Sequence, residues 1–262
     1  MRIRRLGWAG LEVEAEDVTL VVDLFENVGS LEPFVGEAHE PLPGPSRSAT
    51  VALVTHLHSD HADPPAIAGA LADDGLVLGP PAGSGEGLET IGMAAARSGF
   101  EELGLDMREM EPWETTEVGP FRITAVPAVD GFGDPQVSWV IDAGGRRILH
   151  GGDTVFHGSW WLIAMRYGPF DAVFLPVNGA VCDLPHRQPP SPLPAAMDPA
   201  QAATAAHLLG ASAAVPIHYG ALHRPPVYAQ VDAPAETFVA AAAAAGVRTA
   251  VLEPGAALEF DR

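Results

Sequence analysis

Short apolar or alternating runs recur along the chain, separated by turn-forming residues or by segments with helical periodicity. Runs of about four to eight such residues are typical of β-strands. They predict strands at residues 11–16, 18–23, 50–55, 75–79, 121–126, 137–142, 146–150, 171–177, 213–217, 248–253 and 257–260. The helical pattern predicts helices at about residues 64–73, 85–98, 159–167, 199–209 and 234–245.

The two halves of the chain share a similar order of strands and helices. Asp63 and Asp198 stand at expected helix N-caps, and each is followed by proline, whose missing N–H costs nothing at the first helical position. Two sheets faced by helices accommodate this order, so we expect an α/β fold of the αββα sandwich type. A length of 262 residues and a hydrophobic content of 47% fit one compact domain over residues 1–262.

The densest group of chemically active side chains directly follows the apolar run at residues 51–54. Residues 55–61 read Thr-His-Leu-His-Ser-Asp-His. On an extended segment His56 and His58 leave the same side of the backbone, and Asp60 and His61 then fall on the following turn. Any one of these histidines alone would be taken for an exposed loop residue. A cluster of neutral and anionic donors this dense instead indicates a metal ion between them.

The pattern H-x-H-x-D-H after a strand resembles the signature of the metallo-β-lactamase superfamily. Further segments are similar to other motifs of that superfamily, in the expected order: residues 6–10 and 21–23, His-Gly-Gly-Asp-Thr at 150–154, and Val-Pro-Ile-His-Tyr at 215–219. Three details resemble the branch that contains L-ascorbate-6-phosphate lactonase and related metal-dependent hydrolases. They are His150 directly before Gly-Gly-Asp-Thr, residues 197–203, and Pro-Ile-His-Tyr at 216–219.

This resemblance implies a binuclear metal centre with a defined ligand set. The ligands would be His56, His58 and Asp130 for one ion, Asp60, His61 and His218 for the other, and Asp153 between the two. The metals implied are two divalent ions, zinc or manganese, with iron also open.

Two residues depart from the pattern of that branch. Trp8 stands where a histidine is usual, and Asp130 replaces the histidine that is usual after Pro-Ala-x. A carboxylate at this position adds negative charge and shifts the preference toward harder metals such as manganese or iron. The alternative is that Asp130 only opens the glycine-rich turn at residues 130–134, which would leave one metal position weak or empty.

The implied centre suits hydrolysis. A water held between two divalent ions loses its proton near neutral pH, because its pKa falls from about 15.7 to about 7. The metal-bound hydroxide would then attack an ester, lactone, amide or phosphodiester bond of a small-molecule substrate, and Asp60 is expected to be catalytic as well as a ligand. Candidate proton donors for the leaving group are His157, His186 and His223, and each is otherwise a solvated surface histidine.

Several further features bear on the substrate site. Residues 29–48 and 178–198 are long segments rich in proline and glycine, and we expect them to form the walls of the cleft. The pair Trp160 and Trp161 is a candidate apolar wall, with core packing as the alternative. Cys182 is the single cysteine, so an intrachain disulfide and a thiolate metal cluster are both excluded.

Charge and hydropathy restrict the partners and the location. The formal charge is −20, and the 14 basic residues are all arginine, which argues against a nucleic-acid backbone as the main partner. No run of about 18 apolar residues is present, and the basic N-terminus leads into no hydrophobic segment of signal-peptide length. We therefore expect a cytoplasmic protein that does not enter a membrane. A homo-oligomer is left open.

Two other classes of function compete with a hydrolase. The first is a non-catalytic member of the fold that binds or senses a small molecule, which the departures at Trp8 and Asp130 allow. The second is an iron-dependent redox metalloprotein that uses the same ligands, which analogy within the superfamily allows. Measurement of metal content together with turnover separates the three.

Overall fold

A computed structural model describes residues 1–82, 88–185 and 187–260. Its strands are β1 (Arg2–Arg5), β2 (Leu11–Ala15), β3 (Val18–Val22), β4 (Ala49–Leu53), β5 (Leu71–Gly79), β6 (Met107–Glu109), β7 (Thr115–Val118), β8 (Phe121–Pro127), β9 (Val137–Ala143), β10 (Arg146–His150), β11 (Ala172–Pro176), β12 (Val181–Cys182), β13 (Ala214–Ile217), β14 (Tyr228–Ala229) and β15 (Ala257–Glu259). Its helices are η1 (Gly29–Leu31), α1 (Glu32–Val35), α2 (Pro64–Ala70), α3 (Leu88–Glu102), α4 (Trp160–Tyr167), α5 (Pro199–Leu208) and α6 (Pro234–Ala244).

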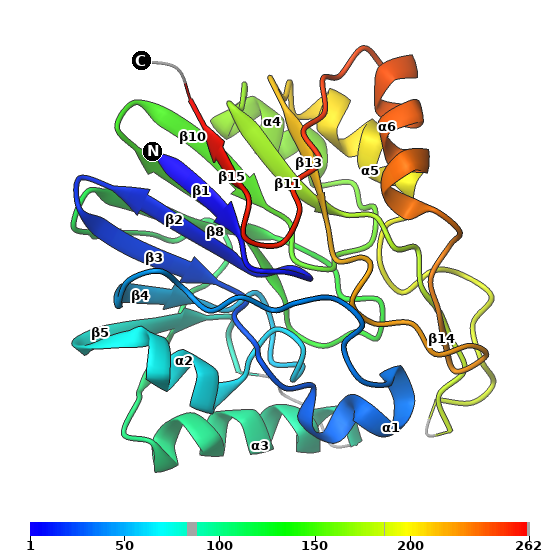
Figure 1. Cartoon of the computed structure of the whole chain (residues 1–262), viewed down its shortest axis with the longest axis horizontal. Coiled ribbons are helices and arrows are strands. Elements are labelled where there is room, and N and C mark those ends of the chain that lie inside the picture. The colour runs from blue at the N-terminus through cyan, green and yellow to red at the C-terminus, as the bar shows by residue number, and fades with distance from the viewer. Residues whose placement is uncertain (83–87, 186, 261–262) are drawn as a thin grey trace.

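Two large sheets pack face to face, and helices cover the outer side of each (Figure 1). One sheet has the order β15-β1-β2-β3-β4-β5-β6 and is covered by α2 and α3. The other has the order β13-β11-β10-β9-β8-β7 and is covered by α4, α5 and α6. A short ribbon of β12 and β14 lies apart from both sheets. The expected αββα sandwich is confirmed.

The alternation of side chains along the inner strands builds these layers. Leu20 and Val22 of β3 enter the core between the sheets, whereas Val21 between them packs under α2 and α3. In the other sheet Phe174 of β11 points into the same central core, and its neighbour Val173 packs under the helices on the outer side. Successive side chains of a strand face opposite sides, so a continuous apolar run can be buried on both faces.

Both expected N-caps are present. The Asp63 side chain accepts a hydrogen bond from Ala66 N at the start of α2. At the start of α5, Asp198 and Gln201 form a reciprocal capping box. The helix expected at residues 64–73 ends at Ala70, because the chain turns there into β5. The start expected for the next helix, at residues 85–87, lies outside the described residues.

Some strands differ from expectation. The strand predicted at residues 248–253 is wrong: a single bridge between Thr249 and Ala214 forms there, and Val251 is exposed. The backbone at that point pairs with the edge of β13 without forming a continuous ladder. In contrast, β1 was not predicted, because its sequence Arg-Ile-Arg-Arg is mostly charged. Its arginines pair across the strand with glutamates of β2, as in the contact of Arg4 with Glu12.

Within the described part of the chain, none of the helices has the length and apolar character needed to cross a bilayer.

Candidate metal centre

Residues that follow the ends of five strands meet at one edge of the sandwich. They are Asp23 after β3, the segment 55–61 after β4, Asp130 after β8, Asp153 after β10 and His218 after β13. The strands β3 and β4 run parallel, as do β10, β11 and β13, so their carboxyl ends lie at the same edge of each sheet. The fold therefore brings together polar groups that are far apart in the sequence.

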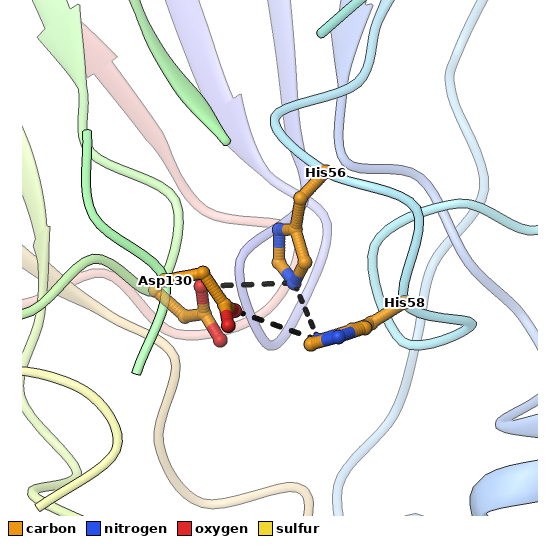
Figure 2. Close-up of side chains that lie close together, drawn as sticks. His56, His58 and Asp130 are labelled. Carbon is orange, nitrogen blue, oxygen red and sulfur yellow. Dashed lines mark hydrogen bonds and ion pairs between the residues drawn. The ribbon is translucent and has the colours of Figure 1, made fainter. Parts of the chain in front are cut away.

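Four side chains form a first donor group: His56, His58, Asp130 and Asp153, whose ligand atoms all lie within 4.8 Å of one another. Nε2 of His56 faces Nδ1 of His58 at 2.9 Å. Asp130 Oδ2 lies 3.8 Å from His58 Nδ1, and Asp153 Oδ1 lies 3.6 Å from His56 Nε2. Figure 2 shows His56 and His58 from the segment after β4 facing Asp130 from the segment after β8. Asp130 therefore lies within reach of the same point as the two histidines.

Asp60, His61 and His218 form a second donor group, again with ligand atoms within 4.8 Å of one another. Asp60 Oδ2 lies 3.5 Å from His61 Nε2 and 3.8 Å from His218 Nε2. Asp153 connects the groups, because its Oδ1 faces His56 and its Oδ2 lies 3.9 Å from His218 Nε2. The structure thus places every metal ligand expected from the sequence in one of two adjoining groups.

Three of the four imidazoles are oriented by a partner on the far side of the ring. The Thr55 hydroxyl lies 3.1 Å from His56 Nδ1, His58 Nε2 donates to Asp134 Oδ2 at 2.8 Å, and His61 Nδ1 donates to Asp23 Oδ2 at 2.8 Å. In each ring this leaves the other nitrogen directed at the donor group. Such buried acceptors fix the tautomer and orientation of metal-binding histidines.

Asp23 and Asp134 are site residues that the sequence analysis did not identify. Asp23 is fully buried and also accepts from the backbone N–H and the hydroxyl of Thr55, each at 2.8 Å. Its position directly after an apolar strand could have indicated a site residue, because the candidate ligands lie in similar positions. Asp134 gave no comparable signal, since it lies inside a turn. Its role depends on a contact across 76 positions of sequence with His58.

Some of the strained backbone of the molecule lies at this edge. Trp8, Asp23 and His218 have positive φ angles of 44°, 46° and 57°. Such conformations cost on the order of 1–3 kcal/mol for residues with a side chain and persist where the surroundings hold them. Here His218 N donates to Trp8 O at 2.9 Å, and Asp23 N donates to Leu53 O at 2.9 Å. These strained residues all contact the donor groups, which is typical of a functional site.

Two imidazoles of the site, His58 and His61, retain protons at neutral pH. Burial disfavours the protonated form of His58, but its hydrogen bond to Asp134 and the nearby carboxylates, Asp130 first, raise its pKa to about 9. Burial also opposes protonation of His61, yet the carboxylates of Asp60 and Asp23 raise its pKa to about 10. The carboxylates around the donor groups thus attract positive charge into the site.

Other groups of the site shift because they are buried. Burial raises the pKa of the Asp153 carboxyl to about 7 and lowers the pKa of His218 to about 4. Burial also holds the pKa of His56 well below its usual value, and the neighbouring histidines add to this effect. His56 and His218 are therefore neutral at physiological pH, the state that binds a metal ion.

Metal affinity is expected to fall as the pH decreases from about 9 to about 6, because a divalent ion must displace the protons of His58 and His61. Each displaced proton should change the dissociation constant about tenfold per pH unit in this window. Titration calorimetry with Mn²⁺ at several pH values, in two buffers of different ionisation enthalpy, measures both the affinity and the protons released. A constant affinity with no proton release would contradict this expectation.

The donor set fits divalent metal ions. His61 Nε2, His218 Nε2 and Asp130 Oδ2 are buried and have no hydrogen-bond partner among the described residues. Buried polar atoms without partners are rare, since each carries a desolvation penalty, and an ion would satisfy all three. The two groups contain four histidines and three aspartates. Mixed nitrogen and oxygen donors of this kind suit zinc, manganese or iron.

Two of the candidate proton donors, His157 and His223, lie outside both donor groups. His157 stacks on Trp160, with ring centroids 4.4 Å apart, and burial lowers its pKa to about 4. His223 Nδ1 accepts a hydrogen bond from Gln230 N at 3.3 Å. His186 lies outside the described residues. Trp160 itself is fully buried in the core under the helices, so core packing is the correct reading, whereas Trp161 is about half exposed.

Asn178 and Tyr228 are further residues near the centre that the sequence did not indicate. Asn178 follows β11, the strand between β10 and β13, so it lies between the segments that carry Asp153 and His218. Its buried amide donates to the Tyr228 hydroxyl at 2.9 Å. Burial raises the pKa of Tyr228 well above its usual value, and the carboxylates of Asp60 and Asp153 add to this shift. Tyr228 therefore keeps its proton at neutral pH.

Comparison with known proteins agrees with this architecture. Residues 22–219 match the model of the Beta-lactamase superfamily domain, a range that includes the whole donor set. The chain therefore belongs to the metallo-β-lactamase superfamily. It is 28% identical over 272 residues to a UPF0173 metal-dependent hydrolase from Methanopyrus kandleri, with 99% of this chain and 100% of the relative covered.

Two solved structures have the same fold at low sequence identity. An isothiocyanate hydrolase from Delia radicum gut bacteria superposes with a TM-score of 0.72 at 19% identity, over 99% of each chain. CmlA, a diiron beta-hydroxylase from Streptomyces venezuelae, superposes with a TM-score of 0.74 at 19% identity, over 99% of this chain and 54% of CmlA. At this identity the likeness concerns the fold alone.

Proposed function

We propose that this protein is a metal-dependent hydrolase that holds two divalent ions, zinc or manganese, and acts on a small molecule. The observation that carries the proposal is the pair of donor groups connected by Asp153, with buried ligand atoms that lack other partners. The similarity to proteins named metal-dependent hydrolases supports the reaction class.

The chemistry that such ions supply when bound is activation of water and polarisation of a carbonyl or phosphoryl oxygen. The residues of this chain prepare the site for that chemistry. Asp23, Asp134 and Thr55 hold the imidazoles in a fixed orientation. Asp60 is held as a carboxylate, because its histidine neighbours lower its pKa despite its burial. Asp60 therefore stays anionic, the state in which it can bind a metal ion or accept a hydrogen bond at the reacting centre.

For the proton donor to the leaving group we favour His223 over His157. Burial lowers the pKa of His157 to about 4, so this side chain is uncharged at neutral pH and has no imidazolium proton to give. His223 is only partly buried, and its Nδ1 accepts from Gln230 N, so Nε2 is the ring nitrogen that can carry a proton.

The substrate class proposed is a small ester, lactone or phosphodiester. The net charge of −20 and the three aspartates among the donors disfavour a nucleic-acid backbone. A lactone substrate, as in the ascorbate-6-phosphate lactonase branch, remains one member of this class. An activity screen over lactones, acyl esters and phosphodiesters, with the metal-loaded protein, distinguishes the members.

Protein purified without exposure to a chelator is expected to contain up to two divalent transition-metal ions per chain. Removal of the ions should abolish hydrolysis, since the water-activating group is lost, and restored Mn²⁺ or Zn²⁺ should return it. Elemental analysis and turnover of the same preparation, before and after dialysis against a chelator, test this prediction. Absence of any stoichiometric metal from the untreated protein would overturn the proposal.

The same measurements separate the competing functions. A protein with bound metal that turns over no substrate of the screen would be a binding or sensing module. A protein that holds iron and consumes oxygen would be a redox metalloprotein, a candidate that the three carboxylate donors favour because iron accepts oxygen ligands readily.

A further inference from the structure

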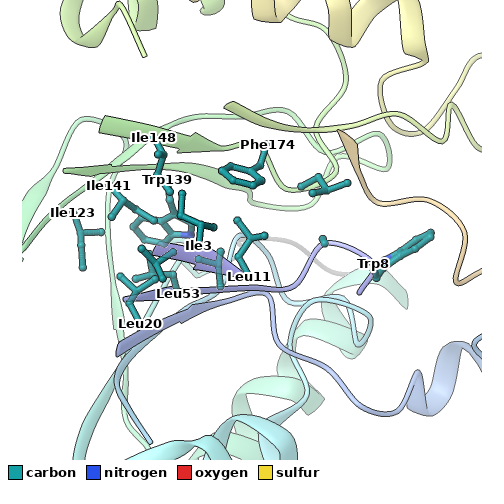
Figure 3. Packing of buried hydrophobic residues seen from close by; sticks show 14 of the residues in the cluster. Ile3, Trp8, Leu11, Leu20, Leu53, Ile123, Trp139, Ile141, Ile148 and Phe174 are labelled. Atoms are coloured by element: carbon teal, nitrogen blue, oxygen red, sulfur yellow. The ribbon is translucent and has the colours of Figure 1, made fainter. Parts of the chain in front are cut away.

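Trp8 contacts two members of the second donor group. Its indole Nε1 donates to Asp60 Oδ2 at 3.1 Å, and its ring lies against the imidazole of His218, with centroids 4.0 Å apart. Its carbonyl oxygen accepts from His218 N at 2.9 Å. Figure 3 shows Trp8 at one end of the central core, apart from the packed side chains around Trp139. Trp8 thus belongs to the central core and also contacts the second donor group.

The turn that carries Trp8 is fixed independently of Asp60. Leu6 N donates to Gly10 O at 2.7 Å, and Gly10 N donates to Gly7 O at 2.8 Å, so hydrogen bonds close the turn on both sides of Trp8. Trp8 N donates to Glu40 Oε1 at 3.1 Å, and the guanidinium of Arg5 binds the same oxygen at 2.8 Å. The backbone of Trp8 is therefore held by contacts that do not involve Asp60.

His218 lacks the anchor that the other imidazoles of the centre have. The rings of His56, His58 and His61 each contact an oxygen of Thr55, Asp134 or Asp23, in that order. In His218 both ring nitrogens are buried and have no such partner within the described ranges. Its orientation depends instead on its backbone hydrogen bond to Trp8 and on the packing of its ring against the indole.

We propose that Trp8 is the positioning residue of the second donor group. Its N–H holds the Asp60 carboxylate with Oδ2 toward His61 and His218, and its ring and carbonyl hold His218 in place of a hydrogen-bond partner. The indole carries no charge and offers no lone pair to a metal ion, so its contribution is orientation. This inference rests on the proposed metal-binding function and extends it to a residue outside the ligand set.

The test compares Trp8→Phe with wild-type protein in competition titrations with Zn²⁺ that resolve two dissociation constants. Phenylalanine keeps an aromatic ring but removes the N–H. One constant is expected to rise roughly 10–100-fold, the range found when a partner that orients a ligand is removed, while the other stays within about threefold. Trp139→Phe is the matched control. Its indole is equally buried in the same core and its Nε1 has no partner in the described structure, so both constants should be unchanged.

A spectroscopic measurement on the wild-type protein covers the case in which Trp8→Phe fails to fold. With ¹⁵N-labelled tryptophan, one indole N–H resonance should shift when Zn²⁺ fills the second donor group, and that of Trp139 should not. Unchanged constants in a folded Trp8→Phe, an equal rise of both constants, or no indole shift on metal addition would each overturn the inference. Wild-type protein that binds no second ion would instead overturn the proposed binuclear site.

Discussion

Replacement of Asp153 by alanine is expected to lower turnover by more than the roughly 10–100-fold that loss of a group orienting a ligand causes, because the ions that would activate water lose a shared carboxylate. The reason is the position of its carboxylate, which faces His56 with one oxygen and His218 with the other. Loss of a group shared by both donor groups should also weaken metal binding by more than the roughly 10–100-fold that loss of an orienting partner causes.

The same substitution is expected to leave the metal-free protein at least as stable as wild type above about pH 7. Burial raises the pKa of Asp153 to about 7, whereas an unfolded aspartate ionises near 4. Between these values the folded state binds more protons, so this group's contribution to stability decreases as the pH rises, and at higher pH the buried charge is unfavourable. Alanine removes that charge. Thermal unfolding at about pH 8, with and without Mn²⁺, measures this effect. Without metal, Asp153→Ala should unfold at the same temperature as wild type or at a higher one. With Mn²⁺, wild type should unfold at the higher temperature, because it binds the ion more tightly.

Asp142→Ala is the matched control for Asp153→Ala. Asp142 lies in the same sheet and forms an ion pair with Arg147 on a partly exposed surface. Removal of such a pair changes stability by about 0–1 kcal/mol and should alter neither metal content nor turnover. If Asp153→Ala retains both ions and full turnover, the carboxylate does not connect the two donor groups.

The sequence indicated that the candidate ligands would meet, because most of them lie shortly beyond the end of an apolar strand. His56, His58, Asp153 and His218 are found within five positions of a strand end. Parallel strands that neighbour one another present their carboxyl ends together, so local patterns were sufficient to predict a common edge. The same reasoning placed Asp130 at that edge, although its residue type departs from the resembled family.

The groups that orient the ligands could not be predicted in this way. The contact of Asp134 with His58 and that of Trp8 with Asp60 join segments whose relative position depends on the packing of complete layers. The hydrogen bond between Asn178 and Tyr228 spans 50 positions and depends on the short ribbon of β12 and β14. No periodicity in the sequence indicates such contacts, because they are properties of the tertiary fold.

The strand errors have a related cause. The pattern of apolar residues indicates whether a segment can be buried, whereas strand pairing also depends on which strands lie beside that segment in the fold. The charged strand β1 forms because β2 and β15 pair with it on both sides and β2 supplies glutamates to its arginines. Residues 248–253 are apolar enough for a strand, yet their backbone pairs with β13 through one bridge only. Tertiary context overrides local pattern in both cases.

Substitution of Asp130 by histidine is expected to change metal preference more than fold. Asp130 Oδ2 is buried, has no hydrogen-bond partner in the described part of the chain and lies 3.8 Å from His58 Nδ1. An imidazole at this position removes one negative charge and offers a softer donor. The ratio of zinc to manganese affinity should therefore rise, by roughly tenfold or more, which corresponds to about 1.4 kcal/mol.

The other oxygen of Asp130 has a structural role that the experiment must separate from ligation. Oδ1 accepts from Phe132 N at 2.6 Å and from Asp134 N at 3.2 Å, which shapes the turn that also holds Asp134 against His58. Asp130→Asn keeps an acceptor for these two N–H groups but removes the charge. It should weaken binding of both metals without reversing their order, whereas Asp130→His should favour zinc selectively.

Competition between Zn²⁺ and Mn²⁺ in wild type and in the two variants measures these preferences, and far-UV circular dichroism checks the fold. If the ratio of the two affinities is the same in all three folded proteins, Asp130 does not bind a metal ion, and its carboxylate only shapes the turn. The first site would then consist of His56, His58 and the shared Asp153. The second donor group would then bind a metal ion more tightly than the first, because none of its three ligands is Asp130.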